Sequence, residues 1–270
     1  MSTFQRMFLE LYEPVMKSKG FHRKRHIFHR LVNNKIVQML SYCMFSGRRE
    51  FTIQYDYVPL CSGDDFEFFM DAHRIGSLMG KESYGDRDPN NPDHIRETLE
   101  LCQEYIFPFF DRMVDYESLY DYEIKRHEIM LSESSEAYKK AHSELLKAPM
   151  TSSFLAVSIA TGHYDMAQKS REAVIYQNED ALSAFIEFID RTRQSPCPEF
   201  IREREERIAL KKEELALLKK AVDTNDKAFF EEYIHAKEKC ALENYIRNYY
   251  GKRAFDLYKN SGKLPFELTE

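Results

Sequence analysis

Residues 50–59 have the sequence EFTIQYDYVP, in which apolar or aromatic residues alternate with polar ones. The apolar or aromatic set is Phe51, Ile53, Tyr55 and Tyr57, and the polar set is Thr52, Gln54 and Asp56. Successive side chains of a β-strand point to opposite faces, so this period of two predicts a strand with one buried face.

Two further strands are predicted upstream of this segment. Residues 35–45, KIVQMLSYCMF, form a nearly continuous apolar run that ends at a turn at Ser46-Gly47. Before them, Asn33-Asn34 is a dipeptide that tolerates the positive φ angles of a tight hairpin, and residues 22–32 lead into it as a strand. The pattern predicts a three-stranded antiparallel meander, within a sheet of three or four strands.

Helices are predicted on both sides of the meander. Residues 3–18 repeat apolar side chains at helical spacing, and Gly20 comes next as a left-handed C′ residue. A second helix is expected over about 66–79. An isolated meander is unstable in water, so we expect these two helices to cover one face of it.

The remainder of the chain predicts helices almost throughout. Asn91-Pro92 is a typical N-cap and N1 pair, and Pro108 should kink or interrupt the helix that begins there. The later predicted helices span 116–131, 135–147, 152–161, 165–176, 180–193, 198–222, 226–249 and 252–260. The last long pair, 198–222 and 226–249, is expected to pack antiparallel.

These elements place the chain in the α+β class. We predict a small antiparallel β-meander packed with helices, followed by an all-helical C-terminal region of antiparallel hairpins. The expected domains are residues 1–130, with the sheet, and residues 131–270, with helices only.

Composition excludes several classes of protein. The chain has 270 residues, of which 43% are hydrophobic and 31% charged, as is ordinary for a globular protein. Its five cysteines are widely spaced without a CxxC pair, which favours reduced thiols over disulfides or a zinc cluster. No segment is typical of a signal peptide or a membrane span, so a cytoplasmic location is expected.

Charge is distributed unevenly along the sequence. From Pro14 to Arg49 there are nine Lys and Arg residues and no Asp or Glu. The chain total is −6, so subtracting these nine positive charges leaves −15 for the remainder. Such asymmetry can mark an anionic partner for the basic segment.

The basic segment supplies the candidate binding residues. The anion-binding candidates are Arg23, Lys24, Arg25, Arg30, Arg48 and Arg49. The alternative is that these side chains protect an edge strand from aggregation, and strand alternation would divide them between two faces. We favour this alternative.

The same segment contains His22, His26 and His29. If residues 22–32 form one strand, the first two histidines share a face and the third points to the other. The pattern therefore argues against a metal site here, and no metal or cofactor is expected.

Motifs for catalysis are absent from the sequence. There is no P-loop, GxGxxG, GxSxG or HExxH pattern, and no catalytic residue is assigned. Carboxylates gather with aromatic residues at 115–123, DYESLYDYE. A row of Asp111, Asp115, Glu123 and His127 could share one helix face, but a solvated or protein-docking acidic surface is the favoured interpretation.

One family resembles the N-terminal part of the chain. The segment KSKGFHRKRHIFHRLVNN (17–34) comes after an amphipathic helix and precedes an apolar strand and then the alternating strand of 50–59. With its Gly-Phe, basic residues and the aromatic-x-Arg at 28–30, this order resembles the bacterial domain-of-unknown-function family 4304. The resemblance covers residues 3–130 at most and is clear over 3–60. It implies an α+β domain and no particular activity.

The functional expectation is binding. The first hypothesis is a cytoplasmic bacterial protein-interaction or regulatory module, of a kind such as toxin defence, that docks a protein partner through its helical half and the segment 115–123. The alternative is anion or nucleic-acid binding through residues 17–49. An unrecognised hydrolase ranks third, and the oligomeric state is left open.

Overall fold

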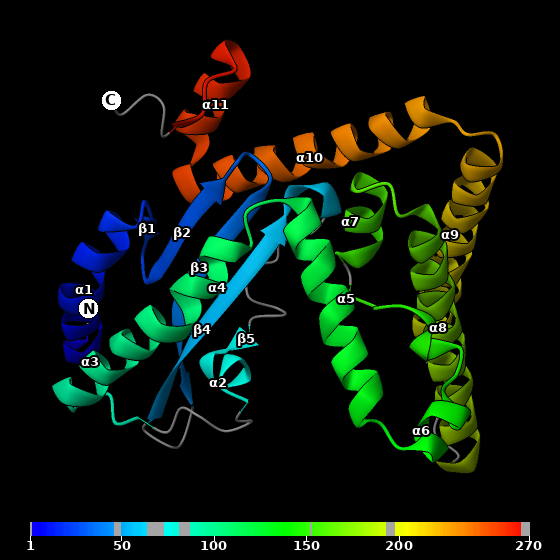
Figure 1. Ribbon diagram of the computed structural model, residues 1–270, viewed down its shortest axis with the longest axis horizontal. Helices are drawn as coiled ribbons and strands as arrows, with labels where there is room; N and C mark the ends of the chain where they lie inside the picture. The colour runs from blue at the N-terminus through cyan, green and yellow to red at the C-terminus, as the bar shows by residue number, and fades with distance from the viewer. Residues whose placement is uncertain are drawn as a thin grey trace. The chain divides into compact units, whose positions relative to one another are not determined.

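A five-stranded antiparallel sheet forms the centre of the N-terminal part of the chain, and the C-terminal region is mostly helical (Figure 1). This is the predicted α+β class. The computed structural model describes residues 2–45, 50–63, 73–80, 87–151, 153–192 and 198–265.

The strands are arranged across the sheet in the order of the sequence. They are β1 (His22–Lys24), β2 (Ile27–Val32), β3 (Ile36–Phe45), β4 (Glu50–Pro59) and β5 (His73–Arg74). The prediction of a single strand over 22–32 is wrong, because a two-residue turn at Arg25-His26 divides it. Arg25 takes a φ of +58°, and β1 folds back antiparallel on β2.

The turn between β2 and β3 confirms the prediction for Asn33-Asn34. These residues have φ angles of +50° and +54°, and the Lys35 N–H donates to the Val32 carbonyl at 2.9 Å. Two successive positive φ angles are those of a type I′ turn, whose twist matches that of paired strands. Val32 then opposes Ile36, so Asn33, Asn34 and Lys35 form the loop between the two strands.

One face of the sheet packs on α1 (Thr3–Ser18) through aromatic rings. Phe4 lies with its ring centroid 4.8 Å from that of Phe51, and Phe8 lies 6.3 Å from Phe28. The alternating side chains of β4 that the sequence assigned to a buried face are buried here. The chain has no Trp, so Phe and Tyr supply the large rings of this layer.

A nearly continuous helix adds to the cover of the same face. It consists of α3 (Pro92–Leu101), the π-helical turn η2 (Cys102–Ile106) and α4 (Phe107–Arg112). Asn91 caps α3 as predicted, since its side chain accepts the Asp93 N–H at 3.0 Å. The predicted interruption at Pro108 takes the form of the π turn just before it, because proline has no N–H to donate to the preceding turn.

The opposite face of the sheet packs on the end of the chain. The C-terminal half of α10 (Lys227–Tyr250) and α11 (Lys252–Ser261) cover it. Tyr245 and Ile246 of α10 form one buried cluster with Val37 and Met39 of β3. Two short elements, η1 (Leu60–Ser62) and α2 (Ile75–Leu78), come directly after β4 and β5. Of the helix predicted over 66–79, residues 66–72 lie outside the described residues, residues 73–74 form a strand instead, and the helical part is residues 75–78.

The chain divides into two compact units, which we call unit 1 and unit 2. Unit 1 comprises residues 1–118 and 237–270, and unit 2 comprises residues 119–236. Unit 1 is therefore discontinuous in sequence. The proposed domains 1–130 and 131–270 remain a prediction about independent folding, which packing alone does not test.

Unit 2 is built from helices. They are α5 (Tyr116–Glu133, from Leu119 onward), α6 (Glu136–Ala141), η3 (Leu145–Lys147), α7 (Phe154–Ala160), α8 (Tyr164–Thr192), α9 (Pro198–Asp223) and the first turns of α10. The predicted break between the helices 165–176 and 180–193 is wrong, because α8 is continuous there. The Asn178 side chain donates to the Val174 carbonyl one turn back, at 2.5 Å, so it is satisfied within the helix.

The predicted pairing of 198–222 with 226–249 is only partly realised. α9 runs antiparallel along α8, as Figure 1 shows, and three ion pairs join the two helices. α10 meets α9 only near their connection, where Phe230 packs with Leu218 and Ala221. The aromatic residues in the second half of α10 bind the sheet of unit 1 instead.

Candidate functional site

Arg30, one of the six anion-binding candidates, is held by contacts within unit 1. Its guanidinium donates to Gln38 Oε1 at 2.8 Å, to the Lys19 carbonyl at 2.7 Å and to Asp111 Oδ1 at 3.3 Å. It also lies over the Phe21 ring, 4.6 Å from the centroid. With its donors used inside the protein, Arg30 holds β2 to the ends of α1 and α4.

Arg23 lies on the same sheet face and is paired as well. Its Nε is 3.2 Å from Glu13 of α1, and Lys17 approaches that carboxylate at 3.0 Å. The hydrogen bond from Lys17 is the main cause that lowers the pKa of Glu13. A shallow pocket of about 360 Å³ opens beside these three side chains and Gly20. The two cations at this pocket, Lys17 and Arg23, already pair with the Glu13 carboxylate.

Lys24 and Arg25 lie at the exposed tip of the β1–β2 hairpin. Lys24 belongs to the opposite sheet face, where its Nζ is 5.6 Å from the centroid of the Tyr249 ring. Arg48 and Arg49 fall outside the described residues. The four described candidates are thus divided between two faces, and the structure does not gather them on one surface.

The histidines of this segment lie differently from the prediction. Because β1 and β2 form a hairpin, His22 and His29 are direct cross-strand partners with ring centroids 6.1 Å apart. His26 lies in the turn, 5.1 Å from the Tyr42 ring. This turn has no signal in the sequence, because Arg25-His26 contains neither Gly nor Asn.

His29 is the most enclosed titratable side chain of the segment. It is 1% exposed, and its Nδ1 is 2.8 Å from the Tyr245 hydroxyl. Burial, and then the positive charges of His22 and Lys24, lower the pKa of His29 to about 3. The imidazole is therefore neutral at ordinary pH, and its hydrogen bond ties β2 to α10.

The four residues that could have shared one helix face divide between the two units. They are Asp111 and Asp115 in unit 1, and Glu123 and His127 in unit 2. Asp115 accepts the Ser118 N–H at 2.9 Å, which is the main cause that lowers its pKa, and His127 Nε2 is 3.0 Å from the Leu146 carbonyl. Across the described part of the chain, no three His, Cys, Asp or Glu side chains gather as they would around a metal ion.

The segment 115–123, which was expected to dock a partner, is partly buried. Tyr116 is 4% exposed, Tyr120 is 9% exposed and Glu123 is 3% exposed. Tyr120 stacks on His163, with ring centroids 3.9 Å apart. Two of the three tyrosines of the segment are thus packed inside the protein, whereas Tyr122 is half-buried and Glu117 and Asp121 are exposed.

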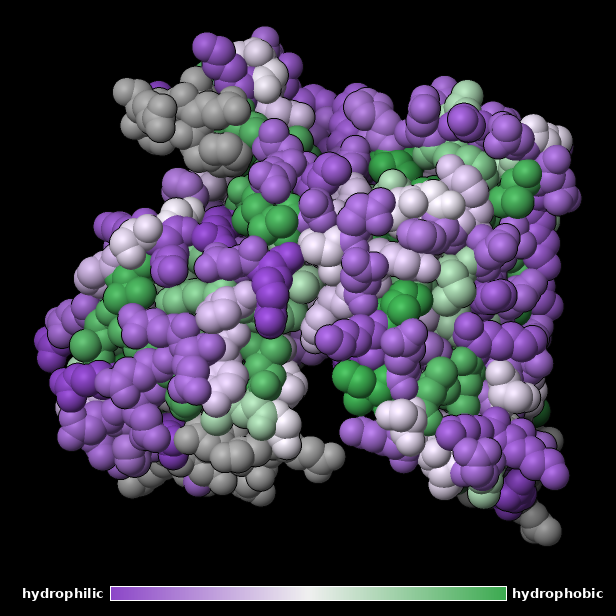
Figure 2. Space-filling model, in the orientation of Figure 1, coloured by the Kyte–Doolittle hydropathy of each residue, from purple (hydrophilic) through white to green (hydrophobic). Residues whose placement is uncertain are grey.

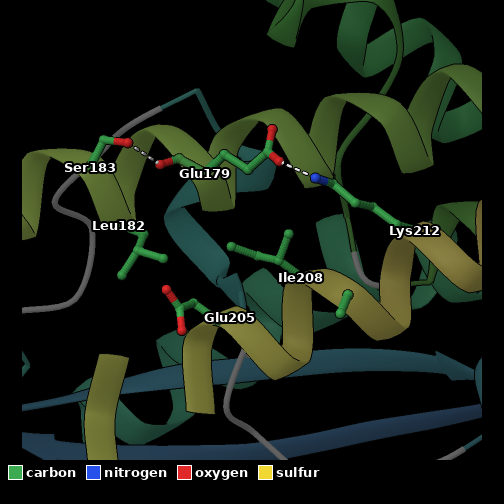
Figure 3. A pocket seen from close by; sticks show the side chains of 7 residues that line it. Glu179, Leu182, Ser183, Glu205, Ile208 and Lys212 are labelled. Atoms are coloured by element: carbon green, nitrogen blue, oxygen red, sulfur yellow. Dashed lines mark hydrogen bonds and ion pairs between the residues drawn. The ribbon is translucent and has the colours of Figure 1, made fainter. Parts of the chain in front are cut away.

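A surface pocket lies between α8 and α9 of unit 2, with a volume of about 480 Å³ (Figure 3). Leu182 and Ile208 point into it from the two helices, and Ala209 adds to its apolar lining. At the rim, Lys212 Nζ is 2.5 Å from Glu179, and the Glu205 carboxylate lies beside the opening. The sequence did not reveal this pocket, because it depends on how far the helices separate.

Apolar side chains are also exposed elsewhere on unit 2. Figure 2 shows hydrophobic surface in separate patches over its helices. The large exposed residues there include Ile129, Met130, Tyr138, Tyr176, Ile186, Phe188, Leu210 and Leu217. Ile186 lies one helical turn beyond Leu182 on α8 and does not line the pocket.

Comparison with known proteins found no relatives. No family model, no curated protein and no solved structure matches the chain. The resemblance to domain-of-unknown-function family 4304 thus rests on residues 3–60 and remains a prediction. Within the described helices, no segment has the length and apolar character needed to cross a membrane.

Proposed function

We propose that this protein is a non-catalytic interaction module that binds a protein partner through the pocket between α8 and α9. The apolar lining by Leu182, Ile208 and Ala209 carries the proposal. A pocket of about 480 Å³ accommodates one or two large side chains. Side chains that anchor in such pockets contribute most of the binding energy of protein interfaces.

The charges at the rim of the pocket favour a partner that carries a basic residue next to the apolar side chain that enters the pocket. Glu179 is neutralised by Lys212, with 2.5 Å between them. Glu205 is exposed and forms no ion pair with the residues that the structure describes. A Lys or Arg next to an apolar anchor would meet this carboxylate.

The helix pair is suited to hold the pocket open before binding. Besides the pair at the rim, Lys219 Nζ is 2.6 Å from Glu172, and Arg171 is 2.5 Å from Glu214. The Arg171 and Glu214 side chains are only 15% and 26% exposed, so solvent screens this pair less than a surface pair. A pre-organised pocket loses little conformational entropy on binding.

Two thiols support the proposed cytoplasmic location. Cys61 and Cys102 are free and buried, which supports a reducing compartment such as the cytoplasm. The resemblance of residues 3–60 to a bacterial family supports a bacterial source.

Quantitative affinity capture tests the proposed interface. The full chain and its Leu182→Glu and Glu205→Arg variants would be cross-linked to bound proteins in producing cells, and the captured proteins compared by mass spectrometry. Loss of an anchoring contact costs about 2 kcal/mol or more, or roughly 30-fold in affinity. We expect at least one protein to be depleted about tenfold or more in both variants.

Leu210→Glu is the matched control, because Leu210 is also on α9 but is 64% exposed and does not line the pocket. It should retain the partner that the two pocket variants lose. Equal capture by wild type and all three variants would refute the proposed interface, as would equal loss in the control.

A further inference from the structure

A group of cations lies on unit 1, where the β1–β2 hairpin meets the end of α10. It consists of Lys24, Arg25, Lys252 and Arg253, all exposed, and we call it the basic surface. None of the four forms an ion pair with the part of the chain that the structure describes. By contrast, Arg23 and Arg30 nearby are held by Glu13 and Asp111.

Contacts of the two tyrosines that end α10 bring these cations together. Lys24 Nζ lies 5.6 Å from the centroid of the Tyr249 ring, and the ring of His22 lies 5.8 Å from that of Tyr250. Lys252 is two residues after Tyr250, and two residues span at most about 7 Å. The hairpin tip therefore lies at this tyrosine pair, and the start of α11 follows the pair directly in the chain.

We infer that the basic surface binds the phosphate backbone of single-stranded nucleic acid. Lys and Arg side chains without a carboxylate partner can replace the counterions of phosphates, which drives such binding. The exposed His22 ring and the half-buried Tyr250 ring contact each other at this surface, and aromatic rings in basic surfaces stack with unpaired bases. This function is separate from the pocket on unit 2.

An anionic membrane fits the surface less well. A helix that binds a membrane interface buries a free apolar face among the lipids. In α11, Ala254, Phe255 and Tyr258 pack on the core of unit 1, and Leu257 is the one large apolar side chain of that helix left exposed among the described residues. The visible side of α11 is hydrophilic in Figure 2.

Fluorescence anisotropy with a labelled 20-nucleotide oligouridine tests the inference on the full chain. Four phosphate contacts on a single strand predict a slope of log affinity against log salt of about −3. Affinity should therefore fall about 50-fold between roughly 50 and 200 mM salt. A labelled 20-base-pair duplex should bind more weakly, because its bases cannot stack on the rings.

Two double variants test the residues. Lys252→Gln with Arg253→Gln should reduce the slope to about −1.4, since two contacts are lost. Lys24→Gln with Arg25→Asn should do the same, and Asn accommodates the positive φ of residue 25. Melting curves would verify that both variants fold like the wild type.

The matched control is Lys220→Gln with Lys227→Gln, which removes from unit 2 two exposed charges that form no ion pair with the described residues. It should bind the oligonucleotide like the wild type. No binding by the wild type at about 50 mM salt would overturn the inference, as would equal losses in the control or tighter binding of the duplex. Binding to vesicles with 30 mol% phosphatidylserine but not to RNA would also overturn it, in favour of a lipid surface.

Discussion

His29 shows how one residue can make stability depend on pH. Its pKa of about 3 in the folded protein lies well below the ordinary value near 6.5, mainly because it is buried. Between these two pH values the unfolded chain binds a proton that the folded protein does not. The free energy of unfolding should therefore fall as pH is lowered from about 6.5 toward 3.

We predict a contribution from His29 of up to about 1.4 kcal/mol per pH unit in that window. The variant His29→Gln keeps a hydrogen-bond partner for Tyr245. In this variant, the slope of the free energy of unfolding against pH should be shallower by about this amount. Urea unfolding at several pH values measures it. His235→Gln, which replaces an exposed histidine of unit 2, is the control. Identical slopes in wild type and His29→Gln would contradict the prediction.

The cysteines differ in reactivity for the same reason, burial. Burial raises the pKa of Cys102 to about 12, and burial with the nearby Glu238 carboxylate raises the pKa of Cys61. Cys240 is exposed on α10. Since the thiolate is the reactive form, iodoacetamide at pH 8 should label Cys240 well before Cys61 or Cys102.

Peptide mass spectrometry over time measures this order of labelling. Both buried thiols should become reactive only after unfolding in urea, which serves as the positive control. Labelling of Cys61 or Cys102 in the folded protein at the rate of Cys240 would show that unit 1 opens locally.

At the scale of elements, the end of α1 is set by Gly20. It has a φ of +78°, the Phe21 N–H donates to the Met16 carbonyl at 2.9 Å, and the Gly20 N–H donates to the Lys17 carbonyl at 3.0 Å. This pair of hydrogen bonds defines the Schellman motif. It confirms the left-handed C′ position that the sequence indicated.

Gly20→Ala should lower the free energy of unfolding by about 1–2 kcal/mol, because a Cβ disfavours this backbone conformation. No atom lies within 4 Å of the site where that Cβ would be built, so the cost comes from the backbone and not from a clash. Urea unfolding measures the change. Gly20→Asn should cost clearly less, since Asn tolerates positive φ, and equal costs for the two variants would contradict this explanation.

The elements that the sequence predicted correctly are those with strong local signals. Gly20, Asn33-Asn34 and the alternation of 50–59 each specify their own conformation, and the structure agrees. The division of 22–32 into two strands was missed, because Arg25-His26 forms its turn under the constraint of strand pairing. Tertiary contacts outweigh local preference there.

The candidate site was less predictable than the fold. The sequence marked basic residues, but which of them keep their charge unpaired depends on distant partners such as Asp111 for Arg30. Lys252 and Arg253 are distant from Lys24 in the sequence. They belong to the same surface only because α10, which precedes them, packs on the sheet. The pocket on unit 2 likewise depends on the spacing of two helices and has no sequence motif.

At the scale of the whole molecule, unit 1 needs both ends of the chain. Residues 237–270 belong to it, and Ala241, Tyr245 and Tyr249 cover the sheet face that carries Val37 and Met39. Without them, this apolar face and the His29 side chain would be exposed to water. A sheet with an uncovered apolar face loses much of its stabilisation and tends to aggregate.

We therefore predict that a chain ending at residue 236 does not form a stable unit 1. It should bind a hydrophobic dye strongly, and the sharp unfolding transition of unit 1 should be lost, whereas a chain ending at residue 265 should unfold like the full protein. A synthetic peptide of residues 237–265 should restore the transition, because it supplies the missing cover in trans. A dye-free, cooperatively unfolding chain of residues 1–236 would contradict this dependence of the sheet on α10. Failure of the peptide to restore a lost transition would show that the covalent link through α10 is required as well.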